Sequence, residues 1–214
     1  MPVESIKRKG LRMIEILTIL KLEYPDSKCS LNYNTPFQLL VATVLSAQCT
    51  DERVNKVVVP LFDKYPTPES FTQLTIEEIG KEIFSTGFYN NKAKSIKGLS
   101  HAIVDQYKGS VPGSMDELVK LPGVGRKTAN VVLGNIFDVP GVVVDTHVTR
   151  IANLLSFTKS KNAVIIEREL GKIINKSDWT LFTHLIIDHG RAICVANRPN
   201  CSECSISNFC PSSK

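Results

Sequence analysis

Four cysteines near the C-terminus have a spacing that suits a multi-iron centre. Cys194, Cys201, Cys204 and Cys210 form the pattern C-x6-C-x2-C-x5-C. Structural zinc sites more often pair two short C-x2-C segments, and only Cys201 and Cys204 are spaced in that way. Long and unequal spacers suit a [4Fe-4S] cube, in which each of four irons takes one thiolate. The spacing therefore favours an iron–sulfur cluster, with zinc and two disulfides as the alternatives.

The amino terminus argues against the disulfides. The first ten residues, MPVESIKRKG, contain no apolar segment of the kind that a secretory signal requires. We therefore expect the protein to stay in the reducing cytoplasm, where disulfides are rare.

The stretch LPGVGRKTAN, residues 121 to 130, could bind a phosphate. Gly123 and Gly125 flank Val124 in a predicted tight bend between two helices, and Lys127 lies in the first turn of the second helix. Glycines leave backbone N–H groups open, and the helix adds the positive end of its dipole at the same place. The alternative is a plain corner between two helices with nothing bound.

A carboxylate follows a short apolar run. The segment VVVDTHV, residues 142 to 148, places Asp145 at the start of a predicted helix. Aspartate is common there as an N-cap, because it accepts a hydrogen bond from the first turn. Spacing alone therefore favours a capping role over a catalytic one.

The hydrophobic pattern predicts an all-α fold. The longest helices are expected over about 5–24, 92–107, 127–137 and 178–193, and the helix over 37–45 is apolar on nearly every side, which is typical of a bundle centre. Capping boxes are predicted at Thr75 with Glu78 and at Ser114 with Glu117. The run 142–144 has no partner strand of comparable length, so we expect it to be extended coil.

Composition limits the function classes. The chain has 214 residues, 43% of them hydrophobic, and a formal charge of +5. This length buries a real core, and the mild positive charge permits a nucleic-acid partner without requiring one. No apolar run reaches the length of a membrane span, so a membrane protein is not expected.

Taken together, the motifs resemble those of the endonuclease III family of DNA glycosylases. The resemblance covers nearly the whole chain and rests on LSAQCTD at 45–51, GFYNNKAK at 87–94, LPGVGRKTAN, VDTHV, HGRAIC at 189–194 and the four cysteines. It implies two helical domains: a six-helix barrel over 29–139, with a helix-hairpin-helix at about 115–137, and a [4Fe-4S] cluster domain made of 1–28 and 140–214. It also implies a bacterial-type, nucleoid-associated monomer that acts on double-stranded DNA.

The resemblance further implies the reaction. Lys127 would attack C1′ of the damaged nucleotide, expel an oxidised pyrimidine and form a Schiff base, after which β-elimination would cut the strand at the abasic site. Asp145 would stabilise the positive charge that develops on the sugar. Gln48 would fill the gap left by the extruded nucleotide, and Phe88 would wedge into the opposite strand.

Other contacts to DNA are implied by motif position. The hairpin residues Gly123, Val124 and Gly125 would hold a phosphate, His147 would face the nucleotide pocket, and Arg198 would lie against the phosphate backbone. The four cysteines would ligate the cluster.

Three alternatives differ from this interpretation. A monofunctional adenine or thymine mismatch glycosylase of the same superfamily would lack the lysine, and the adenine relatives add a C-terminal domain, whereas this sequence ends four residues after Cys210. A non-catalytic helix-hairpin-helix module would need neither Lys127 nor Asp145. A cluster protein for electron transfer would not need the hairpin.

Overall fold

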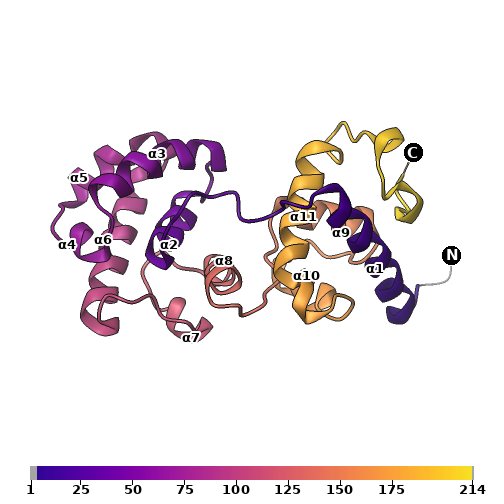
Figure 1. Ribbon diagram of the computed structural model, residues 1–214, viewed down its shortest axis with the longest axis horizontal. Helices are drawn as coiled ribbons and strands as arrows, with labels where there is room; N and C mark the ends of the chain where they lie inside the picture. Colours follow the sequence, from indigo (N-terminus) through magenta and orange to yellow (C-terminus); the bar gives the residue numbers. More distant parts are fainter. Residues whose placement is uncertain (1–3, 214) are drawn as a thin grey trace. The chain divides into compact units, whose positions relative to one another are not determined.

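The chain folds into two compact units, each made of helices. The computed structural model describes residues 4–213, and its units are Ser30–Val139 (unit 2) and the combination of Met1–Cys29 with Pro140–Lys214 (unit 1). The boundaries expected from the sequence include residues 1–3 and 214, which lie outside the described residues. The N-terminal helix therefore shares a unit with the C-terminal third of the chain (Figure 1).

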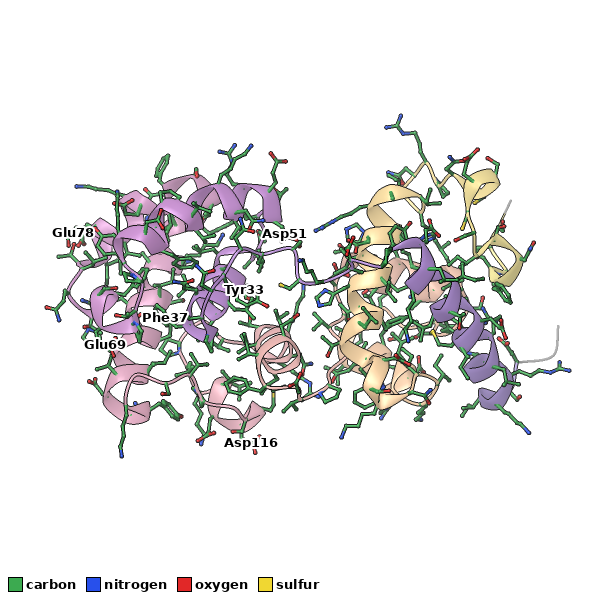
Figure 2. All side chains as sticks on the ribbon, viewed as in Figure 1. Tyr33, Phe37, Asp51, Glu69, Glu78 and Asp116 are labelled. Carbon is green, nitrogen blue, oxygen red and sulfur yellow. The ribbon has the colours of Figure 1, made fainter. Side chains whose placement is uncertain are left out.

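Unit 2 is organised around its first helix. Its elements in chain order are α2 (Pro36–Leu45), α3 (Asp51–Lys64), α4 (Pro68–Thr72), α5 (Ile76–Glu82), η1 (Phe84–Thr86), α6 (Tyr89–Tyr107), α7 (Met115–Leu118) and α8 (Arg126–Ile136). Every residue of α2 from Phe37 to Leu45 is buried, and α2 contacts α3, α6 and α8. The predicted central helix is confirmed. Phe37 lies inside the unit, whereas Glu69 and Glu78, in the first turns of α4 and α5, lie at its edge (Figure 2).

Unit 1 packs four longer helices around a single core. Its elements are α1 (Ile6–Glu23), α9 (Thr146–Leu154), α10 (Ala163–Leu170), η2 (Lys176–Asp178), α11 (Trp179–Ala192), η3 (Cys201–Glu203) and η4 (Ser207–Phe209). Met13, Ile16 and Leu20 of α1 pack with Ile151 of α9 and Phe182 of α11. The cysteines Cys194, Cys204 and Cys210 pack against this same core, so the C-terminal loop is anchored to it.

The predicted fold class is confirmed, with corrections at some helix ends. The described residues contain helices, turns and coil but no strand, and 142–144 is extended coil as expected. The capping box at Thr75 and Glu78 forms. The one at Ser114 is incomplete, because the Ser114 hydroxyl donates to the Glu117 carboxylate (2.6 Å) and the reciprocal bond to the Ser114 amide is not made. Residues 4–213 include no helix long and apolar enough to cross a membrane.

The long helix α6 begins three residues before its predicted start. Phe88 has left-handed backbone angles (φ 49°, ψ 27°) and serves as the N-cap, while its carbonyl accepts from the amides of Asn91 and Lys92. A bulky residue in this conformation is rare and is not signalled by hydrophobic periodicity. The helix therefore starts at Tyr89 rather than at Lys92.

Candidate nucleic-acid interface and cysteine pocket

The hairpin between α7 and α8 depends on Gly123. Its φ is +76°, and a Cβ built there would lie 2.5 Å from the Cβ of Ser95. Glycine is required both by the left-handed backbone and by the approach of the neighbouring helix α6. Val124 is buried and its amide donates to the Leu121 carbonyl (3.1 Å), so both its side chain and its N–H are engaged inside the hairpin.

Gly125 differs from Gly123. It is the N-cap of α8 with an extended backbone (φ −93°), and a Cβ added there would meet no atom within 4 Å. Neither a left-handed backbone nor a close approach therefore requires glycine at position 125, in contrast to position 123. The amides of Gly123 and Gly125 have no acceptor among residues 4–213, so both can donate to an anion.

These two glycines give a matched pair of substitutions. Gly123→Ala should destabilise unit 2 by about 1–3 kcal/mol, because it combines backbone strain with the clash at Ser95. Gly125→Ala should leave the melting temperature nearly unchanged, yet weaken binding to undamaged duplex by roughly tenfold if phosphate approaches the open space at this position. Thermal unfolding measures the stability of each variant, and a binding titration at fixed salt measures its affinity for duplex. Wild-type affinity in Gly125→Ala would place the phosphate elsewhere.

Lys127 is exposed at the second position of α8. Within unit 2 it lies next to the open amides of the hairpin, in a first helical turn that contains no acidic residue. An exposed amine beside open backbone donors can reach a strand whose phosphate those donors hold.

Gln48 and Phe88 share an uncommon backbone conformation. Gln48 has φ 53° and Phe88 has φ 49°, and both side chains are exposed. Phe88 is 64% exposed, which is a large apolar surface for one side chain to leave in water. Strained residues of this kind gather at functional sites, because the rest of the fold has to hold them in place.

Asp145 is the N-cap of α9 and is half-buried. Its Oδ1 accepts from the Val148 amide at 2.8 Å, as the capping interpretation predicts. Only one carboxylate oxygen is needed for that bond, so the cap leaves the second oxygen able to interact with a ligand.

His147 lies in a network with α11. Its Nδ1 is 3.5 Å from Nη2 of Arg150, and a Cβ added to Gly190 would lie 2.7 Å from that same nitrogen of His147. Arg150 Nη2 also donates to the carbonyls of Cys194 (2.6 Å) and Gly190 (3.2 Å). Arg150 thus connects the start of α9 to the first cysteine. Nothing in the sequence pattern distinguishes it from a surface arginine.

The four clustered cysteines line one pocket in unit 1. Ile151, Leu155, Ile193 and Ile206 contribute to walls that are mainly apolar. None of these four cysteines forms a disulfide among residues 4–213. The four expected ligands are therefore brought together, while Cys29 and Cys49 lie outside the pocket.

The pocket makes free thiolates costly. Burial raises the pKa of the Cys194 and Cys204 thiols. The Arg150 charge offsets part of this rise at Cys194 and the Ile206 backbone offsets part of it at Cys204, while the charges of the neighbouring cysteines add to it. A positively charged centre would remove this penalty, since thiolates are the form that binds metal. Among residues 4–213, no three His, Cys, Asp or Glu side chains are drawn together as one metal ion requires. Four thiols that line one pocket match the donor set of a [4Fe-4S] group, in which each of four irons takes one thiolate.

The buried ring of His189 contacts the thiol of Cys204. His189 is 1% exposed, with Nε2 3.7 Å from Sγ of Cys204 and Nδ1 3.4 Å from the Tyr24 hydroxyl. Burial lowers the pKa of His189 and raises that of Tyr24. A neutral ring that donates to the sulfur and accepts from the hydroxyl satisfies both contacts.

The loop between the first two cysteines is exposed, and Arg198 lies on it. The amide of Arg198 donates to the Val195 carbonyl (3.3 Å), and Asn197 has φ 66°. Next to the last cysteine in the chain, Phe209 has its carbonyl bound by Arg12 of α1 (2.9 Å), and the same guanidinium stacks over the Phe157 ring at 4.2 Å. Arg12 therefore fixes the C-terminal loop to α1.

Comparison with known proteins gives one consistent family. Residues 41–176 match the model of the HhH-GPD superfamily of base excision DNA repair proteins. The endonuclease III of Synechocystis sp. (strain ATCC 27184 / PCC 6803 / Kazusa) is 52% identical over 213 residues, covering 99% of this chain and 97% of the relative. A solved non-covalent endonuclease III–DNA complex superposes with a TM-score of 0.91 at 43% identity, covering 95% of this chain and 96% of that one. A trapped covalent endonuclease III–DNA intermediate gives 0.90 at 43% identity, with the same coverage.

Proposed function

The chain belongs to the endonuclease III family of HhH-GPD base excision DNA repair proteins, and we propose that it excises oxidised pyrimidines from duplex DNA and then cleaves the abasic site. The observation that carries the proposal is Lys127, exposed in the first turn of α8 beside the two open amides of the hairpin. These amides would hold a phosphate, and the amine would then lie close to the sugar of the same strand.

Lys127 would act as the nucleophile. Its neutral amine adds to C1′, the bond to the base breaks, and the departing base takes up a proton. The ammonium formed by this attack passes one proton to the ring oxygen as the sugar ring opens, and the protonated imine that results acidifies the C2′ hydrogen. Removal of that hydrogen expels the 3′ phosphate by β-elimination, and water then releases the lysine from the unsaturated sugar.

Asp145 would act as a negative charge near the sugar. Its cap bond to Val148 fixes one carboxylate oxygen, which holds the group in one orientation before the substrate arrives. Such a preorganised charge stabilises the positive sugar that forms as the base departs.

Gln48 and Phe88 would replace the extruded nucleotide. Both are exposed on loops of unit 2, and a flipped nucleotide leaves a gap whose filling offsets part of the cost of unstacking. Val124, with its amide and side chain engaged, would support the hairpin while Gly123 and Gly125 donate to phosphate.

Cys194, Cys201, Cys204 and Cys210 would hold a [4Fe-4S] cluster, which when bound cross-links the C-terminal segments through iron–thiolate bonds. The lysine chemistry does not require it. Arg150 and Arg12 would hold the two ends of the cysteine segment, and the ordered loop would present Arg198 to phosphate. With free thiols and a DNA substrate, we infer that the protein acts inside the bacterial cell.

Anaerobically purified protein should be yellow-brown, absorb broadly at about 400 nm and contain iron with little zinc. Cys204→Ser should lower the iron content, the absorbance and the melting temperature together, because it removes one ligand and the acceptor for His189. Cys29→Ser, outside the pocket, is the control and should leave the iron content unchanged. One zinc per chain and no iron would exclude the cluster.

The function is tested on a duplex with a single thymine glycol. Wild-type protein should cut the strand at the lesion, and borohydride should convert part of it into a covalent protein–DNA adduct by reducing the imine. A monofunctional glycosylase would release the base without cutting the strand or forming an adduct. A DNA-binding module would do neither.

A further inference from the structure

One lysine of unit 2 is buried without a carboxylate. Lys92, in the first turn of α6, is 5% exposed, and its Nζ donates to the carbonyls of Leu45 and Thr86, each at 2.8 Å. Among residues 4–213 no Asp or Glu oxygen lies within ion-pair distance of this nitrogen. The two backbone carbonyls are its hydrogen-bond partners.

Each of these carbonyls adjoins a strained loop. Leu45 is the last residue of α2, and Gln48 with φ 53° lies three residues further on. Thr86 ends η1, and Phe88 with φ 49° lies two residues further on. Both carbonyls lie at helix ends, where the helix itself supplies no donor. One ammonium group thus joins the bases of the two loops that carry the exposed Gln48 and Phe88.

Such an arrangement is costly as a purely structural device. Burial lowers the pKa of Lys92, and nearby Cys49 opposes the shift only in part. A buried charge without a counter-charge costs free energy that apolar packing would not. Both φ values add strain, and neither loop side chain recovers it by burial, because both are exposed.

A second lysine of the same helix supplies the comparison. Lys97 of α6 is half-buried, and its Nζ also donates to two carbonyls, those of Thr72 (2.8 Å) and Leu74 (2.5 Å), at the end of α4. No residue from 72 to 75 has a positive φ. Lys97 therefore makes the same kind of bonds as Lys92, at a place where no strained loop or exposed wedge follows.

We propose that Lys92 is a positioning residue that fixes the loop bearing Gln48 and the loop bearing Phe88 relative to each other, so that both enter the DNA as one rigid unit. The inference rests on the proposed function, in which these two side chains replace the extruded nucleotide. Lys92 does not touch DNA. It acts through the Leu45 and Thr86 carbonyls, and a displacement of either loop of about 1 Å would lower the efficiency of insertion.

The test compares Lys92→Met with Lys97→Met. Methionine keeps the length of the side chain and removes the ammonium group in both cases. Nucleotide extrusion is followed by the fluorescence of 2-aminopurine opposite a tetrahydrofuran abasic analogue, base excision by single-turnover release of thymine glycol, and Lys127 chemistry by cleavage of an abasic site in a single strand. The last reaction has no opposite strand to fill and needs no wedge.

For Lys92→Met we expect extrusion and base excision to fall at least about tenfold, with single-strand cleavage within about twofold of wild type. Lys97→Met should lower the melting temperature about as much as Lys92→Met does, because each variant loses two hydrogen bonds to carbonyls. All three reactions of Lys97→Met should nevertheless stay within about twofold of wild type. If the two variants lose extrusion equally, or if Lys92→Met extrudes normally, the inference is wrong and the proposed function stands. If the wild-type protein neither excises thymine glycol nor forms the adduct, both are wrong.

A second measurement covers the case in which Lys92→Met does not fold. In the protein with Lys92 intact, the extrusion constants of Gln48→Ala, Phe88→Ala and the double variant give the coupling between the loops. If the loops move as one unit, the extrusion constant of the double variant should differ by more than about threefold from the value expected by combining the two single variants. If the loops are independent, the effects of the single variants on the free energy of extrusion should add. Additive effects would overturn the inference.

Discussion

Lys127→Ala should abolish base excision, strand cleavage and the borohydride-trapped adduct while leaving DNA binding nearly intact. The substitution removes the only atom that forms a bond to the sugar in the proposed reaction, so the loss should reach several orders of magnitude. Binding should persist because Gly123 and Gly125 keep their open amides. The fold should persist too, since removing a positive charge from a helix N-terminus is neutral or stabilising.

Lys120→Ala is the matched control. Lys120 is also an exposed lysine next to the hairpin, but it lies before the turn rather than in the first turn of α8. Its loss should weaken duplex binding slightly and lower the salt dependence, with adduct formation retained. Gel analysis after borohydride treatment of abasic duplex separates the two variants. A Lys127→Ala protein that still cuts abasic sites at the wild-type rate would refute the mechanism.

Asp145→Asn should lower excision of thymine glycol by a factor on the order of 10² or more, and should affect cleavage of a preformed abasic site much less. Excision passes through a positively charged sugar, which the carboxylate stabilises. An abasic site already exists as an aldehyde in equilibrium with its ring, so imine formation there needs no such cation. The ratio of the two single-turnover rates is the measurement.

Asp145→Asn separates the charge of Asp145 from its role as the N-cap of α9. The asparagine introduced by Asp145→Asn would still accept from the Val148 amide, and asparagine and aspartate are equally good N-caps, so the stability of α9 should hardly change. Asp145→Ala removes both cap and charge and should cost about 1 kcal/mol of stability in addition. Equal activity of Asp145→Asn and wild type would leave Asp145 as a helix cap only.

Local sequence signals were enough to predict the helical class, most helix positions and the family. Spacing predicts that α1 is a helix, but the stripe expected from Leu11, Ile14, Leu17, Leu20 and Leu22 is partly wrong: Leu11, Ile14 and Leu22 are exposed, and the buried face is Met13, Ile16, Leu17 and Leu20. The all-round apolar segment 37–45 identifies the buried central helix α2. These features can be predicted because a helix and its caps depend on residues three or four apart. The spacing of the cysteines and the PGVG turn are equally local.

Backbone conformation at the loops depends instead on the packing of the folded chain. Phe88 carries a left-handed cap that moves the start of α6, and Gly123 is held against Ser95, whereas Gly125 next to it is unstrained. Periodicity cannot distinguish two glycines two residues apart. The difference comes from the packing of α6 against the hairpin, a contact between segments nearly thirty residues apart in the chain.

Long-range polar contacts likewise exist only in the folded protein. In the sequence, Lys92 resembles any lysine early in a helix, yet its ammonium group is buried against a carbonyl 47 residues away. His189 precedes a cysteine in the sequence, and the fold places it between Tyr24 and Cys204. A buried polar group needs a hydrogen-bond partner, so its contacts show its structural role. Which groups are buried is decided by the folded core and cannot be predicted from neighbouring residues in the sequence.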